Sequence, residues 1–444
     1  MRAFGVPIAY LDSTAPCCSG AGDPPGAMKP SSRLAVLLLL LPAVAGCAQP
    51  RPHYIVPDVR ASDASLARTI EAHTLSPRIP GNAATILLDG DEIFPAMLAA
   101  IRRARTTITF TTYLYEDGPL ADEVANALAE RCRAGVGVNV LVDAVGSHRM
   151  SDHVRTTLRR SGCHVERFRP LNPLDMRRVN RRTHRRVLVI DGRVGFTGGS
   201  GIGAKWTGNG RQPGRWRQTD VRVEGPIVRH LQAAFAELWR ERTGMLLGGD
   251  AYFPDLARRG DVVAQCVRSS PAGGSSEAYN LFLLSLESAR SSINITTPYF
   301  VPDRRISEAL VNAARRGVEV SVLIAGQVDN MADRVVRVAS RQALGAALKG
   351  GVKVYEYTAA MLHAKTLVID GTWASIGSAN LDNRSFALNH ELNVAFFDAT
   401  VAGRLDEVFR ADLEFAREVT YDAWRRRGAG RVFEWFFLPL RNQL

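Results

Sequence analysis

Apolar residues along the chain alternate between short continuous runs and longer amphipathic stretches. The runs, such as 138–142 and 187–190, are rich in Val, Ile and Leu, which is typical of buried strands. Stretches such as 119–135 and 304–317 carry apolar residues at helical spacing. Strands that alternate with helices predict an α/β fold with β-α-β units, in which mixed, mostly parallel sheets lie between helices.

This pattern occurs twice, and the repeat decides the organisation of the chain. It predicts two pseudo-symmetric α-β-α sandwich halves, 85–250 and 251–425, with an active site at their junction. Two independent domains would give the same repeat, so the chemistry has to decide between these arrangements. Five segments, 104–117, 131–147, 162–170, 183–203 and 218–239, are matched in the same order by 289–303, 313–329, 351–359, 362–382 and 389–409.

The N-terminal segment has the pattern of an export signal. Lys29 and Arg33 precede an apolar run over 34–46, which is too short to cross a bilayer as a helix of about 20 residues. The sequence Val-Ala-Gly-Cys that ends at Cys47 resembles a bacterial lipoprotein cleavage site. We therefore expect residues 1–47 to be an N-terminal extension and lipoprotein signal peptide, with a linker over 48–84. Ordinary signal cleavage with an incidental cysteine is the alternative.

The net charge indicates which classes of partner the protein could bind, and the cysteines bear on whether its compartment is oxidising. The chain of 444 residues is 46% hydrophobic and 23% charged, with a net charge of +12, which suits phosphate-bearing partners such as nucleic acid or an anionic membrane. Beyond Cys47, no cysteine has zinc-site spacing. Cys132 ends a predicted helix and Cys163 begins the neighbouring parallel strand, so an oxidising compartment would allow them to form a disulfide, with Cys266 free. Two separate buried thiols are equally compatible with the pattern.

The most distinctive chemistry lies at residues 359–385. His363 and Lys365 are two positions apart and therefore share one face of a predicted strand. Asp370 and Gly371 predict a hairpin turn. The returning strand brings Gly377, Ser378 and Asn380 close to that face, and the missing glycine side chain lets an anion approach the backbone. The segment predicts an anion site that contains a histidine.

These residues resemble the phospholipase D superfamily, which carries two copies of H-x-K-x-x-x-x-D followed by G-[GS]-x-N. Similarity to the cardiolipin synthase branch extends over about residues 85–425, on segments such as Thr-Pro-Tyr-Phe-Val-Pro-Asp and Asn-Leu-Asp-Asn-Arg-Ser. The second copy is complete. The first has His184, Asp191 and Ser200, but Arg186 replaces the lysine and Gly201 replaces the asparagine. Arginine can hold a phosphate oxygen but is larger and planar, so this half could be weakened or inactive.

The resemblance implies a two-histidine mechanism without a metal or cofactor. One imidazole attacks phosphorus to form a phosphohistidine, and the other transfers protons. Asp220 and Glu391 occupy equivalent strand starts after the two motifs and are candidates to orient the histidines. Asp191 and Asp370 lie at predicted turns and, by strand parity, off the face that carries the histidines and cations, so we interpret them as structural members of the site. The cations and small polar residues would stabilise the phosphoryl oxygens: Arg186, Lys365, Ser200, Ser378 and Asn380.

The implied function is phosphatidyl transfer by a cardiolipin synthase-like enzyme, in which an alcohol or water accepts the group. A secreted nuclease-type phosphodiesterase and a catalytically weakened lipid-binding lipoprotein are the alternatives. We expect an anionic phospholipid substrate, a membrane surface, no nucleic acid and a monomer. Ala48 after Cys47 resembles outer-membrane sorting, which places the domain on the periplasmic face of that membrane. The aromatic tail 426–444 either packs on the core or anchors at the interface.

Overall fold

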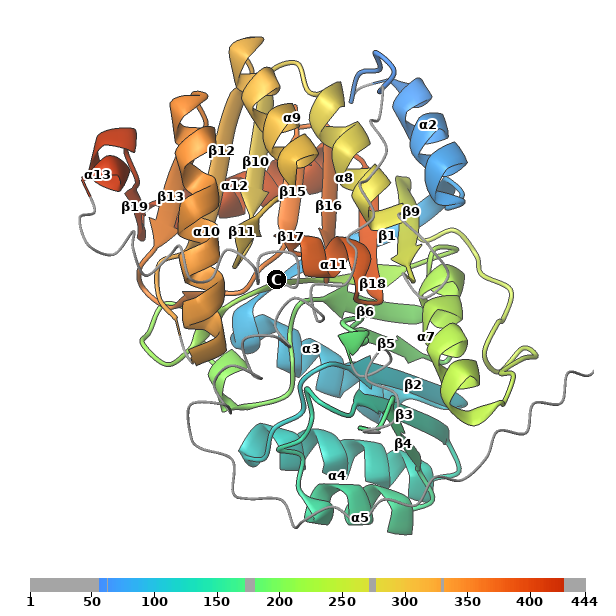
Figure 1. The fold of residues 1–444 in the computed structure, drawn as a ribbon. Coiled ribbons are helices and arrows are strands. Elements are labelled where there is room, and N and C mark those ends of the chain that lie inside the picture. The colour runs from blue at the N-terminus through green and yellow to red at the C-terminus, as the bar shows by residue number, and fades with distance from the viewer. Residues whose placement is uncertain (1–55, 62, 172–179, 271–276, 329–330, 427–444) are drawn as a thin grey trace, which may run out of the picture. The chain divides into compact units, whose positions relative to one another are not determined.

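A mixed sheet of fifteen strands runs through both halves of the protein (Figure 1). The computed structural model describes residues 56–61, 63–171, 180–270, 277–328 and 331–426, without the side chains of 331–335, and all of them belong to one compact unit. The signal peptide, Cys47 and most of the aromatic tail lie outside the described residues. Within the described residues no helix is both long enough and apolar enough to cross a bilayer.

The first half begins with a strand that reaches the middle of the sheet. Apolar residues of its strands face two layers of helices, α7 on one side and α3, α4 and α5 on the other. Its elements are β1 (Ile79–Leu88), α3 (Asp89–Arg103), β2 (Thr107–Thr112), α4 (Pro119–Arg133), β3 (Gly137–Asp143), α5 (Asp152–Arg160), β4 (His164–Phe168), β5 (Val187–Ile190), β6 (Val194–Gly198), the 3-10 helix η1 (Ala204–Trp206), β7 (Trp216–Arg217), β8 (Thr219–Glu224) and α7 (Val228–Thr243).

The second half repeats this order and adds a short edge strand and a terminal helix. Its elements are β9 (Val262–Ser269), α8 (Glu277–Ser288), β10 (Ser292–Thr296), β11 (Phe300–Val301), α9 (Arg304–Arg315), β12 (Glu319–Ala325), α10 (Met331–Lys349), β13 (Lys353–Tyr357), β14 (Met361–Leu362), β15 (Thr366–Ile369), β16 (Trp373–Gly377), β17 (Leu381–Asp382), α11 (Asn383–Ala387), β18 (Glu391–Phe397), α12 (Ala399–Leu413), β19 (Ala416–Glu418) and α13 (Tyr421–Arg425).

The strand order shows the pseudo-two-fold relation of the halves. From the centre outward the first half runs β1-β8-β6-β5-β2-β3-β4 and the second runs β9-β18-β16-β15-β10-β12-β13-β19. Strands β1 and β9 pair antiparallel at the centre and join the two halves into one sheet. The expected α/β sandwich with two pseudo-symmetric halves is therefore confirmed.

The expectation that the sheets are mostly parallel is wrong. Four pairings of the fifteen-stranded sheet are parallel, and the other ten are antiparallel. Among strands that pair with each other, only those of β2-β3-β4 and β10-β12-β13 are joined by helical crossovers, which parallel pairing requires. The later strands of each half follow hairpins and loops, as in the pair β15-β16 around the predicted turn at Asp370.

The alternation of side chains explains why such short apolar runs form strands. In β5, Val187 and Val189 face the central core beneath α7, whereas Leu188 and Ile190 face the core beneath α3 and α4. A strand buried on both faces needs a continuous apolar run rather than an alternating one. This accounts for the Val-Leu-Val-Ile sequence that follows the first histidine motif.

Part of the segment expected as a linker, 48–84, is folded. Helix α2 (Ala64–Thr74) buries Leu66 and Ile70 in the core of the second half, and β1 begins at Ile79. In chain order, α2 comes before the first half but packs against the second. It does so because its apolar stripe at helical spacing must be covered.

The structure contains the predicted disulfide between Cys132 and Cys163, with 5.5 Å between their Cα atoms. Cys132 lies at the end of α4 and Cys163 directly before β4, which pairs parallel with β3. Cys266 is a buried free thiol in β9. Both expectations about the thiols are thus confirmed, and the bridge lies at the edge of the sheet where the parallel strands of the first half begin.

Candidate active site at the junction of the halves

The two motif histidines lie in extended segments that are each hydrogen-bonded to the opposite half. His184 donates its backbone N–H to the carbonyl of His390 (2.9 Å), and His363 donates its own to that of Arg217 (2.8 Å). The expectation that the histidines lie within strands is therefore slightly wrong: His184 precedes β5 and His363 precedes β15. Each segment leaves the main sheet at this point because its backbone partner is in the other half.

A buried ion cluster fixes the segment that holds His363. Arg217 of β7 contacts Asp412 of α12 at 2.8 Å and Asp89 of α3 at 3.1 Å, and β7 pairs with β14 directly before His363. Removing one partner of a buried ion pair leaves an uncompensated charge, which costs roughly 3–5 kcal/mol. The cluster thus ties both halves to the backbone of one site histidine.

Glu391 of the second half orients His184 of the first. Nδ1 of His184 lies 3.1 Å from both carboxylate oxygens of Glu391, which also accepts hydrogen bonds from the Ser378 hydroxyl and from Asn389. Burial, reinforced by Arg186, lowers the pKa of His184 to about 4. The imidazole is therefore neutral at pH 7, with Nδ1–H donating to Glu391 and a lone pair on Nε2.

His363 is oriented through an amide rather than directly by a carboxylate. Its Nδ1 lies 3.4 Å from Oε1 of Gln218, whose Nε2 donates to Asp220 at 2.8 Å. Asp220 also accepts from the Ser200 hydroxyl. A Cβ on Gly199 would lie 2.8 Å from Gln218 Nε2, so the glycine makes room for this amide.

Gln218 was not among the residues predicted from the sequence. A signal was present, because Gln218 and Asn389 stand at equivalent positions, each two residues before the acid of its half. The two halves are therefore similar but not equal: a carboxylate faces His184, and a neutral amide faces His363.

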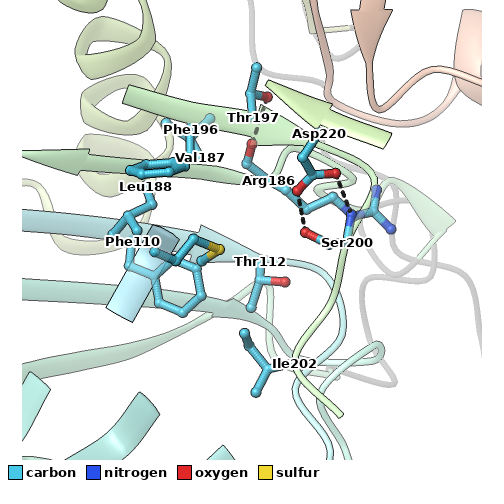
Figure 2. A pocket seen from close by; sticks show the side chains of 11 residues that line it. Phe110, Thr112, Arg186, Val187, Leu188, Phe196, Thr197, Ser200, Ile202 and Asp220 are labelled. Carbon is cyan, nitrogen blue, oxygen red and sulfur yellow. Dashed lines mark hydrogen bonds between the residues drawn. The ribbon is translucent and has the colours of Figure 1, made fainter. Parts of the chain in front are cut away.

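The two motif cations occupy equivalent positions. Nη1 of Arg186 donates to the carbonyl of His184 and Nζ of Lys365 to that of His363, both at 2.6 Å. Figure 2 shows Arg186 beside Ser200 and Asp220 in a pocket whose lining residues all belong to the first half. Nε and Nη2 of Arg186 find no hydrogen-bond partner among the described residues. These donors could hold the oxygens of a phosphate.

We expect Arg186→Lys to retain activity. A lysine at this position can reach the carbonyl of His184 as Lys365 reaches that of His363. Arg186→Ala is the control, and loss of the charge should lower kcat on the order of 10²-fold. The specific activities of the three proteins decide the question. If Arg186→Lys is as impaired as Arg186→Ala, the site depends on the planar guanidinium and its unused donors.

Two groups of the site, His363 and Lys365, have pKa values that burial and neighbouring cations lower. Burial and then Lys365 lower the pKa of His363 well below its usual value, and burial and then Arg186 do the same to Lys365. An anion between these groups would favour their protonated forms and raise both pKa values.

When inorganic phosphate binds near pH 7, His363 and Lys365 should therefore take up protons from the buffer. Calorimetry in two buffers of different ionisation enthalpy measures this uptake as a difference in the observed heat. Lys365→Gln should reduce the difference, because it removes one of the two groups. Equal heats in both buffers, with binding intact, would show that His363 and Lys365 keep their protonation when an anion enters.

Asp191 and Asp370 lie at the far ends of β5 and β15 from the histidines. Oδ1 of Asp191 accepts from the backbone N–H groups of Thr106 and Thr107, and Oδ1 of Asp370 accepts from those of Ser291 and Ser292. Both aspartates have positive φ angles of 52° in their hairpin turns. They hold the turns against the start of β2 and β10, so their contacts are structural.

Asn380 completes the second copy of the motif. Its backbone N–H donates to the Ser385 hydroxyl at 3.0 Å, and its side-chain Oδ1 is buried without a hydrogen-bond partner among the described residues. Ser378 and Ser200 both donate to the acid of their own half, although Ser200 aligns with Ala379 rather than with Ser378. The first copy thus reaches the same contact from the next position along the chain.

Comparison with known proteins places this arrangement in context. The family described as cardiolipin synthase, PLD-like domain, matches residues 97–239 and 283–413. The chain is 35% identical over 350 residues to the major cardiolipin synthase ClsA of Bacillus subtilis. The matched region covers 78% of this chain and 72% of that protein. It is also 35% identical over 345 residues to cardiolipin synthase A of Pseudomonas entomophila, covering 78% and 71%.

Among solved structures, the phosphatidylserine synthase of Haemophilus influenzae has a similar fold. The TM-score is 0.64 at 12% sequence identity, and the match covers 85% of this chain and 100% of that one. At this identity the likeness concerns the fold alone.

Proposed function

Because the chain belongs to the family of cardiolipin synthases with phospholipase D-like domains, we propose that it transfers a phosphatidyl group through a phosphohistidine on His184. The chain is a phosphatidyltransferase of the phospholipase D type. The observation that supports the two-histidine mechanism most directly is the contact of Glu391 with His184 across the junction, opposite His363 with its own polar partner.

In the first step, Nε2 of neutral His184 attacks phosphorus, and an N–P bond forms as the P–O bond to the leaving alcohol breaks. His363, whose protonated form the bound phosphate anion favours, gives its proton to the departing oxygen. Glu391 stabilises the positive charge that develops on the His184 ring, because its carboxylate lies against Nδ1. Gln218 is neutral and offers less stabilisation to a phosphorylated ring, which favours His363 as the proton carrier.

In the second step, His363 removes a proton from the incoming hydroxyl, whose oxygen attacks phosphorus and displaces His184. A P–O bond forms and the N–P bond breaks, so the enzyme returns to its starting state. Arg186 and Lys365 lie at equivalent places on the two sides of the site, where they stabilise charge on the phosphoryl oxygens in both steps.

The proposed substrate is an anionic phospholipid at a membrane surface, and the proposed acceptor is the hydroxyl of an alcohol or water. The test incubates the protein with labelled phosphatidylglycerol and separately with DNA, and then identifies the products. Cardiolipin and free glycerol are expected from the lipid, and no fragments are expected from DNA. Cleavage of DNA alone would support a nuclease, and lipid binding without any product would support a non-catalytic lipoprotein.

We propose that lipid on Cys47 anchors the protein on the periplasmic side of an outer membrane as a monomer. Support comes from the signal-like sequence that ends at Cys47 and from the disulfide between Cys132 and Cys163, since disulfides persist in oxidising compartments.

Cys47→Ala should move the protein from the membrane fraction to the soluble periplasm, because acyl chains supply the anchor. Fractionation followed by immunoblotting measures the distribution, and Cys266→Ala, at a buried thiol, is the control. Retention of the Cys47→Ala protein on the membrane would mean that another part of the chain holds it there.

A further inference from the structure

Two indole rings cover one side of His363. The centroid of the Trp216 ring lies 4.8 Å from that of His363, and the centroid of Trp206 lies 6.0 Å away. The two tryptophans also contact each other at 4.8 Å. Trp206 is 1% exposed, Trp216 is 4% exposed and His363 is 5% exposed. One side of the site is therefore walled by apolar surface from which bulk water is excluded.

This wall explains the departure of the first motif from the family pattern. Gly201 stands where the second copy has Asn380, and a Cβ on Gly201 would lie 2.7 Å from Cη2 of Trp206. An asparagine side chain at this position would overlap the indole. Gly201 is thus a requirement of the Trp206 position, rather than a simple loss of a polar group.

Lys205 and Glu116 hold the wall in place. Nζ of Lys205 lies 4.8 Å from the centroid of Trp206 and 4.3 Å from that of Trp216, and it pairs with Glu116 at 3.2 Å. A cation over indole faces is an attractive arrangement. The rings are therefore fixed by charge as well as by packing.

The surroundings of His184 are different. Its ring contacts Glu391 and the edge of Tyr113, at 5.3 Å between ring centroids, and the guanidinium of Arg186 lies over Tyr113 at 5.8 Å. Polar groups thus surround the proposed nucleophile, whereas apolar surface lies beside the proposed proton carrier. The incoming hydroxyl must approach His363, so the indole wall borders the place where the acceptor binds.

We infer that Trp206 and Trp216 form the wall of an acceptor subsite beside His363 and favour an alcohol over water as the acceptor. This inference rests on the proposed function. An alcohol can bury its methylene groups against the indoles, and each buried methylene is worth about 0.8 kcal/mol. Water has no apolar group to bury, and a water molecule against this wall loses hydrogen bonds to its neighbours.

The reaction that the wall controls is the second step alone. In both outcomes the N–P bond to His184 breaks, a P–O bond forms and His363 accepts one proton from the attacking hydroxyl. Attack by an alcohol gives a phosphodiester, and attack by water gives phosphatidic acid. The ratio of these two products, measured in one reaction, reports how the common intermediate is partitioned and does not depend on the amount of folded enzyme.

The experiment supplies the full-length protein with phosphatidylglycerol vesicles and a fixed concentration of ethanol, and measures phosphatidylethanol and phosphatidic acid by mass spectrometry. Trp216→Ala and Trp206→Ala should each lower the ratio of phosphatidylethanol to phosphatidic acid by about tenfold, the size of effect typical for lost apolar contacts in a pocket. Trp216→Phe should give an intermediate ratio. Trp239→Phe, a buried tryptophan of α7 outside this cluster, should leave the ratio unchanged.

The inference is overturned if both alanine variants keep the ratio of the unmodified protein, or if they lose the two products in equal proportion, including complete loss of both. A change in the Trp239→Phe control as large as in the Trp216 variant would also overturn it. The proposed function fails separately, when the unmodified protein forms none of cardiolipin, phosphatidylethanol and phosphatidic acid from phosphatidylglycerol.

Discussion

Replacement of His363 by alanine should lower turnover of phosphatidylglycerol by at least about 10³-fold, because no other group can then protonate the leaving alcohol and deprotonate the acceptor. His184→Ala should be equally impaired, since it removes the nucleophile. Two single variants with equal losses, and a double variant no worse than either, would show that the two residues act as a unit. Initial rates with labelled lipid in vesicles measure the effect.

His164→Ala is the matched control, because His164 is an exposed histidine at the start of β4 and should leave turnover unchanged. Retention of more than a few per cent of the activity by either site variant contradicts the two-histidine mechanism.

Glu391→Gln should have the second largest effect, a loss on the order of 10³-fold in kcat, which is less than the loss of about 10⁴-fold on neutralising the orienting acid of a serine-protease triad. The glutamine can still accept a hydrogen bond from Nδ1 of His184, but it cannot offset the positive charge of a phosphorylated ring. Because the Glu391 carboxylate also accepts from Ser378 and Asn389, its neutralisation disturbs three hydrogen bonds. The rate of the first turnover measures the loss at the step where His184 attacks.

Asp220→Asn is the comparison, and it should cost less because Gln218 stands between Asp220 and His363. A loss for Asp220→Asn equal to or larger than that for Glu391→Gln would reverse the assignment, with His363 as the nucleophile and His184 as the proton carrier.

Much of the fold could be predicted because the second half of the chain repeats the sequence pattern of the first. Five matched segments in one order indicate two similar halves, and the alternation of strands and helices indicates an α/β fold. The direction of the strands could not be derived in the same way, because a short apolar run such as β5 or β6 reads alike in parallel and antiparallel sheets. Only the connection distinguishes them: helical crossovers join four neighbouring pairs of strands, and the other ten pairings of the sheet are antiparallel.

The site was predictable within each motif and less so between the halves. The two-residue spacing of His363 and Lys365 is visible in the sequence and places both side chains on one face. The disulfide between Cys132 and Cys163 could be predicted because these residues lie next to two adjacent parallel strands. The pairing of His184 with Glu391 joins residues 207 positions apart, and no local pattern specifies it. Trp206 and Trp216 read as ordinary core residues, and their position beside His363 depends on β7 pairing with β14 of the other half.

The most direct test of the account is to trap the phosphatidyl group on the enzyme. The His363→Ala protein should react once with a phosphatidyl ester of p-nitrophenol, because this leaving group needs no proton, and then stop because no base activates the acceptor. We expect a burst of one p-nitrophenolate per site, and peptide mapping under alkaline conditions that finds the phosphatidyl group on His184. A burst that persists when His184 is also replaced by alanine, or a phosphatidyl group on another residue, would contradict the mechanism.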